Sequence, residues 1–177
     1  MLVKYLAQAR NIQTTDSQSK GFTLIELLVV VAIVGILAAI ALPSLLGNIA
    51  KGKQTEPKTT IGSVNRAQQA YRIENNGFAT SMSELGVGLP TTTPNYNYQL
   101  SGSANQATII ATSRDTALKG YSGGVVQHTD QSSNSAIASV ICEADSPGIE
   151  PPAAPVLNAN ASTPETAASC PEGTRQL

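Results

Sequence analysis

The sequence is poor in the residues that most catalytic and metal-binding sites require. Its 177 residues include no tryptophan, one histidine and two cysteines, and aromatic residues make up only 4% of the chain. Two cysteines are too few for a disulfide-dense miniprotein or for a zinc site with four cysteine ligands. Charged residues make up 13%, with 11 basic against 12 acidic, which excludes a long disordered polyelectrolyte and argues against a nucleic-acid surface.

No constellation of residues indicates catalysis or metal binding. His128 has no serine or cysteine nucleophile beside it, and we expect this lone imidazole at the surface, near the end of a strand. The carboxylates of Asp130, Glu143, Asp145 and Glu150 lack the spacing of an EF-hand calcium loop. We therefore expect no enzymatic activity, no cofactor and no metal.

One long apolar run lies near the start of the chain. Between Phe22 and Leu42, 18 of 21 residues are Ala, Val, Ile, Leu or Phe, and the exceptions are Thr23, Glu26 and Gly35. As a helix this run would be roughly 32 Å long, close to the thickness of the hydrocarbon core of a bilayer. Because the run has no polar face, such a helix belongs in lipid or inside an assembly. The simplest interpretation is a single-pass membrane anchor.

Two features do not fit a simple anchor. Glu26 lies near the start of the apolar run, and an ionised carboxylate in hydrocarbon costs roughly 2.5–3.5 kcal/mol on insertion scales. The preceding residues, 1–21, are polar and carry charges of both signs. They contain no apolar region that ends in an Ala-x-Ala site, as a secretory signal peptide would, and they end at Lys20-Gly21 directly before the run.

The segment Gly21–Val30, with the sequence GFTLIELLVV, closely resembles the prepilin motif of type IV pilins and of type II secretion pseudopilins. The resemblance is strong over about residues 18–48 and covers only the general plan elsewhere. It implies that prepilin peptidase cleaves after Gly21 on the cytoplasmic side and that the new amino group of Phe22 is N-methylated. Residues 1–21 would then be a leader that the mature chain lacks.

The resemblance also assigns a role to Glu26. It implies that Glu26 of an arriving subunit pairs with the Phe22 amine of a subunit already in the filament. Apolar helices slide past one another at little cost, whereas a misplaced buried charge costs several kcal/mol, so such a pair would fix the axial register. The alternative is that Glu26 lies at the level of the lipid headgroups and takes no part in assembly.

Gly35 and Pro43 weaken the apolar helix. Pro43 lacks a backbone N–H and leaves the carbonyl of Ala39 without its helical partner, and Gly35 costs about 1 kcal/mol of helix propensity relative to alanine. The resemblance implies that residues 35–43 loosen when the helix passes from the bilayer into the filament. A static kink, or an exit from the bilayer at Pro43, remains an alternative.

The next segment, residues 44–76, keeps a helical pattern of a different kind. Ile61, Val64 and Tyr71 form one apolar stripe against a polar face, which predicts an amphipathic helix that packs on a globular partner. We expect a kink at Pro57 and an end near Asn75-Asn76-Gly77. Together with residues 22–43, this segment would make one long helix.

Residues 77–141 have the pattern of a small sheet. Ser81-Met82-Ser83-Glu84 reads as a capping box that opens a short helical turn, which Gly86-Val87-Gly88 would end. We expect about four antiparallel strands with one face on the helix and the other in solvent. The fold class is therefore α+β, in agreement with the pilin fold that the resemblance implies. The expected strands lie near residues 95–100, 107–112, 125–126 and 136–142.

Cys142 and Cys170 bound a proline-rich segment, which a tail of residues 171–177 follows. The segment holds half of the ten prolines, and its composition shows no pattern that builds a core. In an oxidising exterior we expect a disulfide, worth roughly 3.5 kcal/mol in the chain-entropy model, whereas a reducing compartment would leave two free thiols. The pair resembles the C-terminal disulfide-bounded region of type IV pilins, where contacts with neighbouring subunits concentrate.

The resemblance implies a structural subunit of a type IV pilus, which supports motility, adhesion and DNA uptake. The chain would be a single-pass inner-membrane protein before assembly and part of an extracellular fibre afterwards. Its implied partners are other copies in a helical filament, prepilin peptidase, the inner-membrane assembly machinery and, before assembly, membrane lipid. Loss of the leader leaves 8 basic and 11 acidic residues, so direct binding of nucleic acid is not expected.

Two alternative functions remain open from the residues. One is a pseudopilin of a type II secretion system, or a minor pilin. The other is a membrane-tethered binding domain that does not polymerise and keeps residues 1–21.

Overall fold

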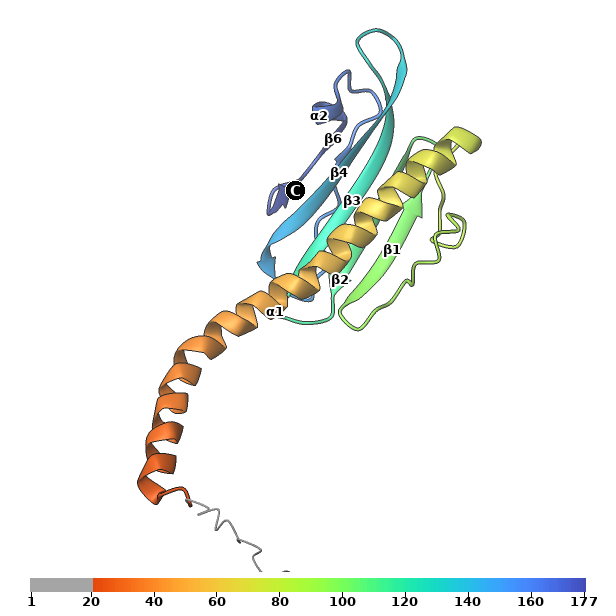
Figure 1. The fold of residues 1–177 in the computed structure, drawn as a ribbon. Coiled ribbons are helices and arrows are strands. Elements are labelled where there is room, and N and C mark those ends of the chain that lie inside the picture. The colour runs from red at the N-terminus through yellow and green to blue at the C-terminus, as the bar shows by residue number, and fades with distance from the viewer. Residues whose placement is uncertain (1–20) are drawn as a thin grey trace, which may run out of the picture. The chain divides into compact units, whose positions relative to one another are not determined.

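The computed structural model describes residues 21–177, and the first 20 residues of the expected leader lie outside this range. The chain divides into two compact units, Met1–Pro43 and Ser44–Leu177. One helix, α1, runs from Leu24 to Glu74 and so contributes to both units (Figure 1). The predicted kink at Pro57 does not interrupt this helix, which ends one residue before the expected Asn75.

The second unit is built around a five-stranded antiparallel sheet in the order β1-β2-β3-β4-β7, across which the second half of α1 lies (Figure 1). The α+β prediction is confirmed. A separate strand pair, β5 with β6, and a short helix, α2, lie in the C-terminal region. The bounds are β1 Tyr96–Gly102, β2 Gln106–Ser113, β3 Lys119–Thr129, β4 Ser135–Pro147, β5 Val156–Leu157, α2 Pro164–Ala167, β6 Ala168–Ser169 and β7 Thr174–Gln176.

The sheet has one strand more than predicted, and β3 is much longer than the expected residues 125–126. The additional strand, β7, comes from the segment that we expected to be a tail, and it pairs with β4. Its sequence Thr-Arg-Gln carries no apolar alternation, so its strand conformation depends on the pairing partner. In β3 the glycines at 120, 123 and 124 hide the strand signal, because glycine is depleted in strands.

Both faces of the sheet are covered at β3, so the expectation of one solvated face is wrong. A Cβ atom on Gly123 would lie 2.2 Å from Cγ2 of Ile61 on α1. A Cβ atom on the next residue, Gly124, would lie 3.0 Å from Cδ1 of Leu157 in the C-terminal region. Because successive residues of a strand face opposite sides, β3 is enclosed between α1 and the C-terminal region.

The C-terminal region also contributes to the core, contrary to the expectation from its composition. Ala161, Ala167 and Ala168 are buried in one apolar cluster with Val126 and Val140 of the sheet. Small side chains give no periodic signal in the sequence, but they let this irregular segment approach the sheet closely. The region is thus a packed layer and not a loose loop.

The predicted capping box, in which Ser81 pairs with Glu84, is wrong because Glu84 pairs with Thr80. The Glu84 carboxylate accepts hydrogen bonds from the backbone N–H of Thr80 at 2.7 Å and from the Thr80 hydroxyl at 2.9 Å. Residues 82–86 form turns and not a helix, and Gly86 and Gly88 both have a φ of 63°. These two glycines redirect the chain toward β1, because the left-handed region suits glycine.

Replacing Gly123 with alanine should destabilise the fold by about 1–3 kcal/mol, the range for overpacking a core. The added methyl group would overlap Ile61, and both residues lie in regular elements that have little room to shift. Thermal unfolding of the full chain in detergent, followed by circular dichroism, measures the effect. Gly148→Ala is the matched control, because a Cβ atom there has nothing within 4 Å. Equal melting temperatures for the two variants would contradict the packing argument.

The structure contains the expected disulfide, Cys142–Cys170, with Cα atoms 5.6 Å apart and a sequence separation of 28. Cys142 lies on β4 and is fully buried. Replacing both cysteines with alanine should therefore lower the free energy of unfolding by about 3.5 kcal/mol. Urea unfolding tests this, and wild-type protein under reductant should behave like the double variant. A wild-type curve that reductant leaves unchanged, together with two titratable thiols, would contradict the disulfide.

Candidate assembly site

The start of α1 is organised by Thr23 and Glu26. The Glu26 Oε2 atom accepts hydrogen bonds from the backbone N–H of Thr23 at 2.9 Å and from its hydroxyl at 2.7 Å. In return the backbone N–H of Glu26 donates to Oγ1 of Thr23 at 3.3 Å. This reciprocal arrangement is a capping box. The sequence carries its Thr-x-x-Glu signature, from which this cap could have been predicted. Glu26 therefore has a local role in addition to any role in assembly.

The Glu26 carboxylate retains capacity for another partner. Its hydrogen bonds within residues 21–177 all use Oε2, so Oε1 can accept from a group outside the chain. Gly21 and Phe22 precede the helix in irregular conformation, and Phe22 is 85% exposed. The expected cleavage point therefore lies in accessible, non-helical backbone, directly before the capping box.

The first half of α1 has an apolar surface that nothing in the described part of the chain covers. An 18-residue stretch has a mean hydropathy of 3.0 and no buried residue, and it is long and apolar enough to cross a membrane. Apolar surface on this scale marks an interaction with lipid or protein. The exposed large apolar residues are Leu24, Ile25, Leu27, Leu28, Val29, Val30, Val31, Ile33, Val34, Ile36, Leu37, Ile40, Leu42, Leu45, Leu46 and Ile49.

The predicted weak segment, residues 35–43, is helical in the structure. α1 is continuous through Gly35 and Pro43, and a Cβ atom on Gly35 would have nothing within 4 Å. The structure therefore places both residues on the exposed apolar helix. Loosening of this segment stays a prediction.

In the second unit, buried polar side chains fix α1 on the sheet and on the loop that follows the helix. The Gln68 side chain donates to the carbonyl of Ala79 and accepts from its N–H, both at 2.9 Å. Asn65 donates from Nδ2 to the carbonyl of Val140 on β4 at 3.1 Å. Buried amides are stable only when they are paired in this way, so these bonds select one position of the helix.

Glu143 is a buried carboxylate at the centre of a charge cluster that joins α1 to three strands, and its cationic partners reach the surface. Its carboxylate contacts the Lys58 ammonium at 3.0 Å, the Lys119 ammonium at 3.1 Å and the guanidinium of Arg175. It also accepts a hydrogen bond from the Tyr121 hydroxyl at 3.0 Å. Burial by itself raises the pKa of the Glu143 carboxyl, but these hydrogen bonds outweigh burial and lower its pKa to about 2. The sequence by itself did not predict this role, because there Glu143 is only one acidic residue among several.

His128 lies in the interior, so the expectation of a surface position is wrong. It is 2% exposed, and neither ring nitrogen has a hydrogen-bond partner among the described residues. His128 lies on the same face of β3 as Gly124 and Val126, the face that the C-terminal region covers. Within residues 21–177 there is also no group of three side chains from His, Cys, Asp and Glu that could hold a metal ion.

Two family models match the chain. Residues 54–171 match the type IV pilin-like G and H family, and residues 16–42 match the prokaryotic N-terminal methylation motif. The second match includes Gly21, Phe22 and Glu26, and the first covers most of the sheet unit. No solved structure matches the chain significantly.

Several characterised proteins are similar to the chain. The type IV major pilin protein PilA of Myxococcus xanthus is 37% identical over 53% of this chain and 42% of its own length. The type IV wide pilus major component PilA4 of Thermus thermophilus is 37% identical over 61% of this chain and 78% of its own length. The type II secretion system core protein G of Escherichia coli is 36% identical over 48% of this chain and 61% of its own length. The match thus covers less than two thirds of the first and third relatives.

Proposed function

Because this chain belongs to the type IV pilin family, we propose that it is a structural subunit that polymerises into a type IV pilus. The observation that carries the proposal is the uncovered apolar surface of α1, which begins beside a single carboxylate, Glu26. Lipid can cover such a surface before assembly, and the same helices of other copies can cover it in a filament. A partner with a positive charge would stabilise this carboxylate further once apolar helices surround it.

The proposed mechanism starts with cleavage after Gly21 by prepilin peptidase. The exposed, non-helical backbone at Gly21 and Phe22 supports access of the peptidase to this bond. Cleavage leaves a free ammonium on Phe22, and a separate transfer of a methyl group from a donor outside this chain then converts it to the N-methylated form. In a neighbouring copy this ammonium pairs with Oε1 of Glu26, while Oε2 maintains the capping box with Thr23.

The pair would act as a register device for helices that otherwise have no preferred axial offset. Close to lipid or protein the effective dielectric is low, so an ion pair formed at the correct offset is favourable and each unpaired charge is costly. Residues 35–43 would loosen as the helix passes from the bilayer into the filament. The chain performs no catalytic step in this proposal, and the inner-membrane assembly machinery supplies the work.

The proposed locations follow from the same residues. The uncovered helix anchors the chain in the inner membrane before assembly, and the filament lies outside the cell afterwards. The disulfide between Cys142 and Cys170 supports an oxidising exterior for the sheet unit. Motility, adhesion and DNA uptake would be activities of the whole fibre.

Shearing of cells followed by mass spectrometry of the sheared fraction tests the proposal. We expect abundant fibres made of a chain that begins at Phe22 and carries one additional methyl group. A fibre fraction in which the chain still begins at Met1 would overturn the proposed mechanism. An unprocessed chain that stays in the membrane would instead support the tethered binding domain.

A second candidate function is a pseudopilin of a type II secretion system. The similarity to the core protein G of Escherichia coli favours it. The same experiment distinguishes the two, because this pseudopilin would be processed at Gly21 but would be nearly absent from the sheared fibre fraction.

A further inference from the structure

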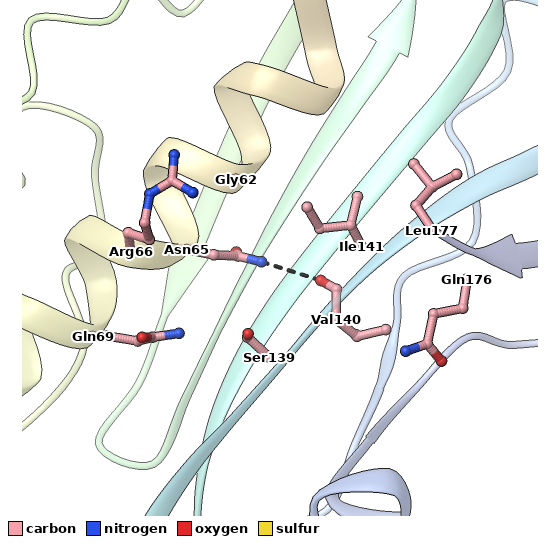
Figure 2. A pocket seen from close by; sticks show the side chains of 9 residues that line it. All are labelled: Gly62, Asn65, Arg66, Gln69, Ser139, Val140, Ile141, Gln176 and Leu177. Carbon is pink, nitrogen blue, oxygen red and sulfur yellow. Dashed lines mark hydrogen bonds between the residues drawn. The ribbon is translucent and has the colours of Figure 1, made fainter. Parts of the chain in front are cut away.

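A hollow of about 260 Å³ lies between α1 and the part of β4 that does not pair with β7 in the second unit. Figure 2 shows Arg66 and Gln69 on the helix side and Ser139 and Gln176 on the strand side. Arg66 is exposed, and the one hydrogen bond that its guanidinium donates within the described range goes to the Ser63 hydroxyl at 3.5 Å. No salt bridge within residues 21–177 includes this guanidinium.

The groups around this hollow suit a carboxylate. The guanidinium of Arg66, the amides of Gln69 and Gln176 and the hydroxyl of Ser139 can all donate hydrogen bonds. A guanidinium binds a carboxylate through two parallel hydrogen bonds, and this pairing is among the strongest that side chains form. Gly62 keeps the hollow open, because a Cβ atom there would lie 3.8 Å from Cδ1 of Ile141 and a longer side chain would project into the space.

Charge is distributed unevenly over the second unit. Residues 144–173 contain four acidic residues, all exposed, and no lysine or arginine. The part of α1 after residue 50 contains five basic residues against two acidic ones. The four acidic residues of the segment 144–173 are Asp145, Glu150, Glu165 and Glu172.

The hollow and the middle of the acidic segment lie on opposite faces of the sheet. The hollow lies on the α1 side of the sheet, whereas residues 153–157 cover the other face, as the contacts of Gly124 with Leu157 and of Ser122 with Ala153 show. A carboxylate from this acidic segment therefore reaches the hollow most simply in a different copy. A contact between two different patches is heterologous and propagates from copy to copy as an open assembly.

We propose that the hollow at Arg66 receives a carboxylate from residues 144–173 of a neighbouring copy of this chain. This proposal rests on the proposed pilus function and adds a second contact, between sheet units, to the one at Glu26. It predicts that charge reversal at Arg66 weakens the filament and that charge reversal in the acidic segment restores it.

The first test is Arg66→Glu in the full-length chain in cells. We expect the mass of sheared fibres to fall about tenfold, because a close interfacial charge pair becomes a repulsive one. Cellular content of the processed chain should be unchanged, since Arg66 is exposed. Lys51→Glu is the matched control, with the same charge change at an exposed position of the same helix four turns away. Wild-type fibre yield for Arg66→Glu, or an equal loss for Lys51→Glu, would overturn the proposal.

The second test is rescue. Arg66→Glu is combined in turn with an arginine at each of the four acidic positions, and we expect one combination to restore most of the fibre mass. Failure of all four would overturn the acidic segment as partner.

If Arg66→Glu lowers cellular content, Gly62→Gln fills the hollow without a charge change and should reduce fibre mass, whereas Gly62→Ala should not. Normal fibres from Gly62→Gln would then overturn the proposal, and absence of the wild-type chain from fibres would instead overturn the pilus function.

Discussion

Glu26→Gln is expected to abolish fibre growth while leaving the start of α1 intact. Glutamine at this position of a capping box still accepts a hydrogen bond from the backbone N–H of Thr23, so the helix start is preserved. Only the negative charge is lost, and with it the proposed pair with the Phe22 ammonium of a neighbour. Sheared fibre mass should fall to background, whereas membrane insertion and cleavage after Gly21 should continue, because removing a charge makes insertion easier.

Thr23→Val is the matched variant that separates the two roles of Glu26. Valine has the shape of threonine but cannot accept the hydrogen bond from the Glu26 N–H, so this change weakens the cap and keeps the carboxylate. Loss of the cap costs about 1 kcal/mol at the helix start and should leave fibres in nearly normal amount. The opposite result, with normal fibres from Glu26→Gln and none from Thr23→Val, would show that Glu26 acts only as a cap.

Glu143→Ala is expected to destabilise the sheet unit by about 1.5–3 kcal/mol, because the hydrogen bonds of a buried charged group are lost while the three cations can turn to solvent. It leaves Lys58, Lys119 and Arg175 close together with no negative charge between them. It also leaves the buried Tyr121 hydroxyl with Gln54 as its one remaining partner in the described chain. Urea unfolding of the full chain in detergent measures the loss.

Glu150→Ala is the control for Glu143→Ala, because Glu150 is exposed and makes no salt bridge within residues 21–177. Its effect should stay within about 0.5 kcal/mol. Similar losses for the two variants would mean that the cluster at Glu143 contributes no more than an isolated surface charge.

The same cluster predicts a pH dependence of stability. The carboxyl of Glu143 has a pKa of about 2 in the folded chain against an ordinary value of 4.5, so the unfolded chain binds its proton first as the pH falls. The stabilisation is therefore complete above about pH 5 and is lost as the pH falls from 4.5 toward 2. Melting temperatures measured across this window should fall more steeply for the wild type than for Glu143→Gln. Parallel curves would contradict the assignment to Glu143.

The sequence alone determined the features that depend on local composition. The apolar run from Phe22 to Leu42, the motif around Glu26 and the amphipathic continuation to residue 74 are all visible in neighbouring residues, because helix formation and lipid affinity depend on nearby side chains. Alternation of apolar and polar residues likewise located β1, and β-branched residues located β2 and β4. The match to the N-terminal methylation motif covers the apolar run and the motif around Glu26, whereas the match to the pilin-like family covers most of the sheet unit.

Only the tertiary structure decided which distant residues meet. The polar segment Thr174–Gln176 is a strand because β4 supplies its partner, and Glu143 has a strongly lowered pKa because α1, β3 and β7 bring three cations to it. His128 is buried because an alanine- and proline-rich segment without any periodic pattern packs over its face of β3. The physical reason is common to all three: periodicity in a sequence indicates that a face is buried, but the identity of the group that covers it depends on contacts between residues far apart in the chain.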